Sequence, residues 1–174
     1  MIKADCTKVQ EICKTPEGAC DKLWQYEHIR QFVIDLNLMI VPLINEGLCT
    51  KETCPKMKAT DMWIYMNAVS GKPQDSCAIE YMVHNLDHSA SILNDPKNFK
   101  SRHTIDDSAQ KYISSIVRRL YRIMSHIYFH HREVFDEFEK RTRVCERFTA
   151  YAKKYSMMSA DLFIIPDEAF KIEQ

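Results

Sequence analysis

Apolar residues recur every three or four positions along most of this chain, which is the spacing of one face of an α-helix. At about 100° per residue, one side of the longest such stripe carries Ile113, Ile116, Val117, Leu120, Met124 and Ile127. Similar stripes predict further helices over Ala4–Lys14, Leu23–Asn45, Cys77–Leu93, Arg132–Thr142 and Val144–Tyr155. The pattern therefore predicts an all-α fold, in which a four-helix bundle core carries accessory helices.

Three segments depart from the helical pattern. Asp61–Met66 is typical of a short strand, and with the turn at Val69–Gln74 it predicts a short β-hairpin. Phe163–Pro166 is expected to cross the core as an extended arm. Asp106 is a plausible N-cap for the helix that carries the longest stripe. Between Leu23 and Asn45 the apolar positions that repeat at helical spacing are Phe32, Val33, Leu36, Ile40, Leu43 and Ile44.

Length and composition narrow the class of protein. At 174 residues the chain is expected to form a single domain over residues 1–174. Its 24 basic side chains balance 24 acidic ones, so no overall field attracts nucleic acid. The sequence has no long apolar run and no apolar segment at its N-terminus, so neither a transmembrane helix nor a signal peptide is predicted. We expect a cytoplasmic protein whose membrane association, where it occurs, is made through partners.

Two cysteines and a group of histidines suggest a metal site. Cys49 and Cys54 form a C-x4-C pair in a polar loop, and thiolates combined with imidazoles suit tetrahedral zinc. If the long helix continues, His126 and His130 share one side and form the natural pair. If it ends near Phe129, His126 and His131 can converge instead. In the alternative without metal, the cysteines are reduced structural thiols and one histidine is buried in the core.

A zinc ion held by four protein side chains has no open position, so it is structural rather than catalytic. It contributes on the order of 10–16 kcal/mol, against a total domain stability of about 5–15 kcal/mol. No nucleophile with its base and no recognised catalytic motif is present, so we expect no enzymatic activity. A zinc hydrolase is the alternative of another class, and it requires three protein ligands and a water. His84 and His88, with Glu80 and Asp87, fit a solvated polar face.

A basic cluster lies on the polar side of the longest helix. Arg118, Arg119 and Arg122 share one arc of its surface, and guanidinium groups bind phosphate through paired hydrogen bonds. The three could together hold one phosphate group of a peptide. The alternative is a solvated face whose arginines pair with nearby acids.

Several strings of residues resemble the Mob family of small zinc-binding adaptor proteins, and most closely its phocein (Mob4-type) branch. The C-x4-C pair lies within CTKETCPKM, and the histidines lie within RRLYRIMSHIYFHH. Further matching strings are WQYEHIRQF at Trp24–Phe32, HNLDHSASILN at His84–Asn94, YFHHREVFDEFE at Tyr128–Glu139 and KYSMMSADLFIIP at Lys154–Pro166. The resemblance covers nearly the whole chain, and it leads us to expect that the N-terminal extension usual in the family is missing.

The resemblance implies an α-helical domain with one structural zinc, a non-enzymatic role and specific site residues. The family's C-x4-C and H-x4-H pattern corresponds to Cys49, Cys54, His126 and His131. Its phosphopeptide-binding basic trio corresponds to Arg118, Arg119 and Arg122. Phocein-type members are implied to join a striatin-like scaffold, type 2A protein phosphatase subunits and Sterile-20-like kinases. A kinase-activating role toward NDR/LATS-type kinases is the alternative, but Lys22 interrupts the acidic surface on which that role depends.

Overall fold

The protein was analysed as a computed structural model, which describes residues 8–101 and 104–171. Over these residues the chain forms six α-helices and three short 3-10 turns. The α-helices are α1 (Val9–Ile12), α2 (Asp21–Asn45), α3 (Ala78–Asn94), α4 (Gln110–His130), α5 (Arg132–Thr142) and α6 (Val144–Lys154). The 3-10 turns are η1 (Asp107–Ala109), η2 (Ala160–Leu162) and η3 (Asp167–Phe170).

The predicted all-α class is confirmed, and the periodic segments became helices within a few residues of their expected ends. Arg132–Thr142 matches α5 at both ends. The first predicted helix is reduced to α1, and its residues 4–7 lie outside the described part of the chain. Asp106 precedes η1, but its side chain makes no capping hydrogen bond.

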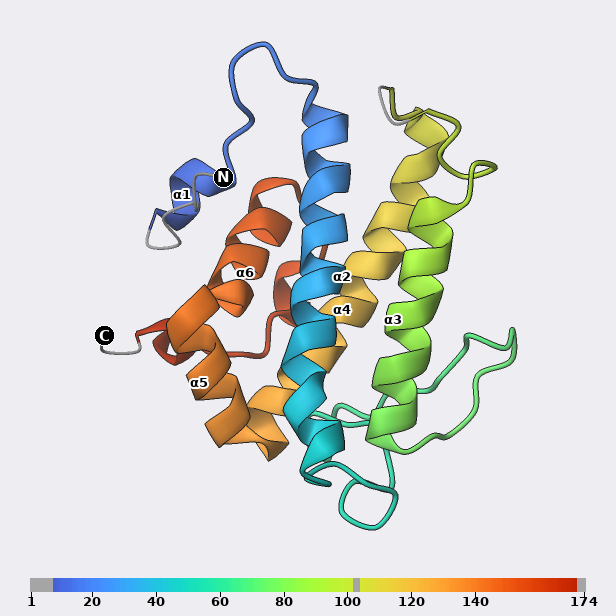
Figure 1. The fold of residues 1–174 in the computed structure, drawn as a ribbon, viewed down its shortest axis with the longest axis vertical. Helices are drawn as coiled ribbons and strands as arrows, with labels where there is room; N and C mark the ends of the chain where they lie inside the picture. Colours follow the sequence, from blue (N-terminus) through green and yellow to red (C-terminus); the bar gives the residue numbers. More distant parts are fainter. Residues whose placement is uncertain (1–7, 102–103, 172–174) are drawn as a thin grey trace.

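Helices α2, α3, α4 and α5 form the core of the bundle, with α6 beside α2 and α5 (Figure 1). Helix α4 contacts α2, α3 and α5, and it buries its apolar stripe completely. Ile113, Ile116, Val117, Leu120, Met124 and Ile127 are all 0% exposed. Within the described residues, no helix is both long enough and apolar enough to cross a membrane.

Helix α2 has a buried face and an exposed apolar face. Its inward residues include Phe32, Leu36, Met39 and Leu43. Ile44, the last apolar position of the pattern, is 49% exposed at the edge of the buried arc. Ile34, Leu38 and Val41 are also exposed, and together with Ile44 they form an apolar stripe that we call the α2 stripe.

The long connection between α2 and α3 does not contain the regular β-hairpin that the sequence suggested. Among the described residues it holds only two isolated antiparallel bridges, Lys58 with Ile64 and Asn67 with Gln74. The second bridge does not extend to a Tyr65–Ser76 pair, because Tyr65 N–H donates instead to the carbonyl of Met57 over 2.8 Å and the carbonyl of Ser76 accepts Met57 N–H over 3.1 Å. The connection is therefore an irregular loop with one short extended segment.

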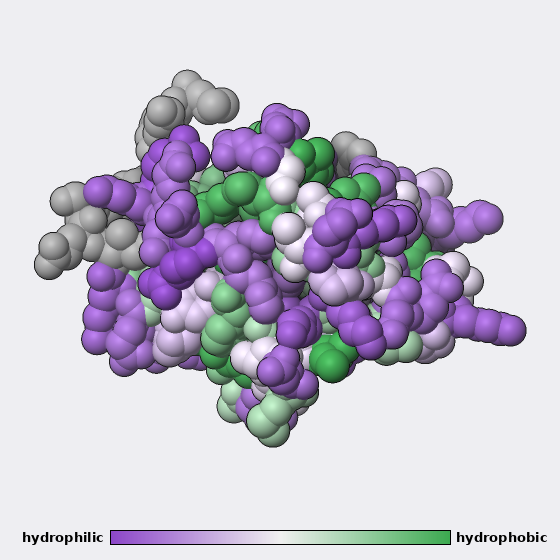
Figure 2. Space-filling model, turned by 90° about the horizontal axis from the view of Figure 1, so that it is seen from below, coloured by the Kyte–Doolittle hydropathy of each residue, from purple (hydrophilic) through white to green (hydrophobic). Residues whose placement is uncertain are grey.

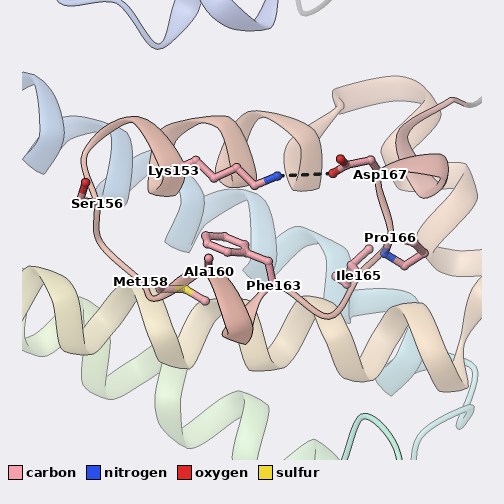
Figure 3. A pocket seen from close by; sticks show the side chains of 8 residues that line it. All are labelled: Lys153, Ser156, Met158, Ala160, Phe163, Ile165, Pro166 and Asp167. Carbon is pink, nitrogen blue, oxygen red and sulfur yellow. Dashed lines mark hydrogen bonds and ion pairs between the residues drawn. The ribbon is translucent and has the colours of Figure 1, made fainter.

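The C-terminal segment crosses the core as expected. The backbone N–H of Ile165 donates to the hydroxyl of Tyr121 over 2.9 Å, and Phe163 packs edge-on against the Tyr121 ring. This arm and α6 line an open surface cavity of about 490 Å³ with Met158, Phe163 and Ile165 in its lining. An ion pair of 3.4 Å between Lys153 and Asp167 closes one side of the cavity (Figure 3).

A buried carboxylate organises the junction between α5 and α6. Glu139 is 2% exposed, and its two oxygens accept the backbone N–H groups of Cys145 and Glu146 over 2.8 and 2.9 Å. These two groups lie in the first turn of α6, where no intrahelical acceptor exists. Burial raises the pKa of Glu139, while the same two hydrogen bonds lower it. Arg143 makes the sharp turn with a left-handed backbone, φ 48°.

We expect Glu139→Ala to lower the free energy of unfolding by about 2–4 kcal/mol, because two buried N–H groups lose their acceptors. Denaturant unfolding followed by circular dichroism measures this change. Glu137→Ala is the matched control, because Glu137 makes only an exposed pair with Arg141 and should change stability by less than about 1 kcal/mol. Equal stability losses in the two variants would contradict the capping role.

Candidate metal centre and basic pocket

Four predicted ligands come from two distant parts of the chain, the loop after α2 and the end of α4. These two parts lie at the lower end of the bundle (Figure 1). The donor atoms of Cys49, Cys54, His126 and His131 all lie within 4.8 Å of one another. The sulfur of Cys49 lies 3.7 Å from Nε2 of His126, and that of Cys54 lies 3.6 Å from Nε2 of His131. In tetrahedral zinc with ordinary bond lengths, sulfur and nitrogen ligands are about 3.6 Å apart. The donor set therefore fits zinc in both chemistry and spacing.

Local backbone geometry presents the two cysteines. Helix α2 ends at Asn45, and Gly47 turns the chain with a left-handed φ of 62°. The loop then closes on itself, since Cys54 N–H donates to the carbonyl of Thr50 over 2.9 Å. Both thiols consequently face the end of α4.

The end of α4 decides which histidines face the thiols. The helix stops at His130, and His131 has non-helical angles of φ −136° and ψ 55°. This break turns His131 toward His126, as the resemblance implied. His130 instead stacks on the His126 ring, with 4.7 Å between ring centroids, and stays exposed.

A backbone contact orients His126 for metal binding. Its Nδ1–H donates to the carbonyl of Lys58 over 2.7 Å, which leaves the lone pair of Nε2 toward the cysteines. Burial lowers the pKa of His126 to about 4, so the imidazole is neutral at neutral pH. Burial, and then the neighbouring Cys54 thiol, raise the pKa of Cys49. A divalent cation would displace these thiol protons, as thiolate coordination requires.

Four protein donors leave no coordination position for a reactive water. The geometry therefore favours a structural site and disfavours the hydrolase alternative. Within the described residues this is the only group of histidine, cysteine and acidic side chains arranged to hold a metal. His84 and His88 do not form a second centre, and His84 lies beside Asn67 instead, with 3.3 Å between Nδ1 and the amide nitrogen.

The three arginines of α4 line a separate pocket of about 330 Å³, which we call the arginine pocket. Its other walls come from α3, through Tyr81 and Asn85, and from the long loop, through Met66 and Ala68. Sequence reasoning missed these four residues, because their own segments carry no phosphate-binding signal. None of the residues that line the pocket is acidic.

The pocket keeps its guanidinium groups away from carboxylates. In the described part of the chain, no ion pair joins Arg118, Arg119 or Arg122 to an acid. Arg122 donates to the hydroxyl of Tyr81 over 3.3 Å, and it also lies 5.0 Å over the ring of Tyr65. Nη1 of Arg119 is buried without a hydrogen-bond partner among the described residues. Burial lowers the pKa of Arg119, and the charges of Arg122 and Arg118 lower it further.

Comparisons with known proteins identify the family of this chain. The Mob1/phocein family profile matches residues 2–165. MOB kinase activator-like 4 of Drosophila melanogaster is 45% identical over 166 residues, which span 95% of this chain and 74% of that protein. MOB-like protein phocein of Caenorhabditis elegans is 43% identical, over 95% of this chain and 73% of its own length. DBF2 kinase activator protein MOB1 of Saccharomyces cerevisiae is 31% identical over 71% of this chain and 40% of its own. This chain therefore belongs to the Mob1/phocein family.

Proposed function

We propose that this protein is a non-enzymatic adaptor that docks in a striatin-centred assembly and binds phosphorylated peptides through its arginine pocket. One observation carries the peptide-binding role: three guanidinium groups line a pocket without a carboxylate, and one of them has a buried, unpartnered N–H group. A phosphate dianion would supply a hydrogen-bond acceptor for this N–H group and the negative charge that the three guanidinium groups lack.

The proposal gives zinc a purely structural part. Cys49 and Cys54 belong to the loop after α2, whereas His126 lies near the end of α4 and His131 directly follows that helix. A zinc ion held by these four side chains would tie the loop to the core. The same loop supplies Met66 and Ala68 to the arginine pocket, so the metal would also hold one wall of the phosphate site.

The proposed partners are a striatin-like scaffold, type 2A phosphatase subunits and Sterile-20-like kinases, because the chain resembles the phocein branch and is 43% identical to a relative named as a MOB-like phocein protein. The α2 stripe supports a docking role. Ile34, Leu38, Val41 and Ile44 are between 44% and 58% exposed and follow one another at spacings of three or four residues, as in helices that pair with another helix. We propose that an amphipathic scaffold helix covers this stripe. The end of the bundle that carries the long loop is mostly hydrophilic, with separate hydrophobic patches (Figure 2).

A kinase-activating role is the second candidate, because two of the relatives are named as kinase activators. That role depends on an acidic surface near the start of α2. Here the Asp21 carboxylate accepts the Thr15 hydroxyl, Lys22 pairs with Asp107, and Glu27 pairs with Arg30 over 3.0 Å. Since these acids already have partners, the scaffold role is preferred.

Cys54→Ala is expected to abolish both zinc binding and stable folding. The metal contributes on the order of 10–16 kcal/mol, which equals or exceeds the stability of a typical domain. Elemental analysis should find about one zinc per chain in the parent protein, and circular dichroism should show loss of the cooperative thermal transition in the variant. Cys20→Ala is the control, since Cys20 is exposed and outside the cluster. A zinc-free variant with an unchanged melting temperature would refute the structural role.

Arg122→Ala is expected to weaken binding of a phosphothreonine peptide at least about tenfold, which corresponds to the loss of one charge-assisted contact. Fluorescence anisotropy at low and high salt measures this change. Lys111→Ala, an exposed change on the same helix, should preserve affinity. Unaltered binding by the Arg122 variant at low salt would argue against the pocket as the phosphate site.

Affinity capture from native lysate tests the scaffold assignment. The parent chain should recover a striatin-type scaffold and phosphatase subunits, identified by mass spectrometry. Leu38→Glu should lose them, because a charge would then face the apolar surface of the scaffold helix. Glu46→Lys, an exposed change just after α2, should retain them. Recovery of an NDR-type kinase, with its activation, in place of the scaffold would favour the second candidate.

A further inference from the structure

The long loop contains an extended segment, residues 62–66, with an exposed apolar row. Met62 is 92% exposed, Ile64 is 49% exposed and Met66 is 44% exposed. Between them, Trp63 and Tyr65 pack against the core. This alternation has the two-residue period of a β-strand, although the segment belongs to no sheet among the described residues.

One edge of this segment has free backbone groups. The inner edge is paired, because the carbonyl of Trp63 accepts Ala59 N–H over 2.9 Å and Tyr65 N–H donates to Met57 over 2.8 Å. In this antiparallel pattern the N–H and C=O of Ile64 point away from Lys58. Within the described part of the chain, the backbone groups of Ile64 and Met66 make no hydrogen bond. Such an edge is a template for an added strand.

The open edge continues into the arginine pocket. Met66 belongs to the apolar row and, with Ala68, also lines that pocket. Side chains on one face of a strand repeat about every 6.7 Å. A peptide paired with this edge, with its phosphorylated side chain in the pocket, would therefore place its next same-face side chains beside Ile64 and Met62.

We propose that residues 62–66 bind an extended peptide as an added β-strand. The preferred ligand is a phosphopeptide with apolar residues two and four positions from the phosphorylated residue, on the side that runs along this segment. The inference rests on the proposed phosphate site, to which it adds the class of peptide and the way its backbone is held. The apolar row provides sequence preference, and the open edge provides sequence-independent hydrogen bonds.

Matched peptides test the side-chain preference. Of two phosphothreonine peptides, one would carry leucine and the other serine at the positions two and four residues before and after the phosphothreonine. Because both sides are changed, the direction of the added strand need not be known. Fluorescence anisotropy should show about tenfold tighter binding of the leucine peptide. Ile64→Ser should remove most of this difference while retaining phosphate-dependent binding. Leu38→Ser, an exposed apolar change on α2, should leave the difference intact.

N-methylation of the leucine phosphopeptide tests the strand pairing. The backbone N–H groups of an added strand point alternately toward and away from the segment beside it. Methyl groups on the nitrogens that face Ile64 and Met66 should weaken binding. Methylation of the intervening nitrogens is the matched control. Equal effects of the two sets of methyl groups would overturn the pairing.

The outcomes also separate this inference from the function on which it rests. If binding depends on phosphate and on Arg122, but the leucine and serine peptides bind equally, the inference fails and the phosphate site survives. If neither peptide binds in a phosphate-dependent way, both proposals fail.

Discussion

The structure depends on the meeting of two loop thiols with two imidazoles from the end of a helix. Each of the close sulfur–nitrogen pairs joins residues 77 positions apart in the sequence. The loop that carries the thiols, between α2 and α3, has no regular strand in its described residues, so hydrogen-bond ladders contribute little to its shape. A metal held by the four side chains would compensate for this deficit, since each ligand bond would fix the backbone near it. The loop could then present Met62, Ile64 and Met66 to solvent without collapsing around them.

Helix α4 combines the core, the metal site and the charged pocket in one element. Its apolar side is fully buried, its last residues supply a ligand, and its polar side carries three arginines. Burying a guanidinium group without an acceptor is unfavourable, because the group loses water and gains nothing in return. The pocket around Arg119 is therefore complementary to an anion that none of the described residues supplies. This arrangement is typical of a binding site and has no evident benefit for stability alone.

An adaptor needs surfaces that can act independently, and this fold offers them on different elements. The α2 stripe lies on a helix, the arginine pocket lies between α3, α4 and the loop, and the open edge belongs to the loop. The two loop-based surfaces share Met66, so one ligand can use both. The α2 stripe shares no residue with them, so a scaffold helix and a phosphopeptide could be held by separate contacts.

The sequence by itself determined where the helices lie and which kinds of side chain could bind a metal, because both depend on local chemistry. The apolar spacing predicted the helical segments, and the C-x4-C pair with its distant histidines predicted a zinc-type donor set. Spacing alone did not choose between His130 and His131, because the choice depends on where α4 ends, and His131 leaves the helix at φ −136°. Only the tertiary structure showed that Tyr81, Asn85, Met66 and Ala68 complete the arginine pocket. These residues come from two segments, α3 and the long loop, which meet α4 only in the folded chain. A cavity between packed elements has no signature in any one of them. The open backbone edge also depends on pairing that side-chain patterns do not encode, since every residue carries the same N–H and C=O groups except proline, which lacks the N–H.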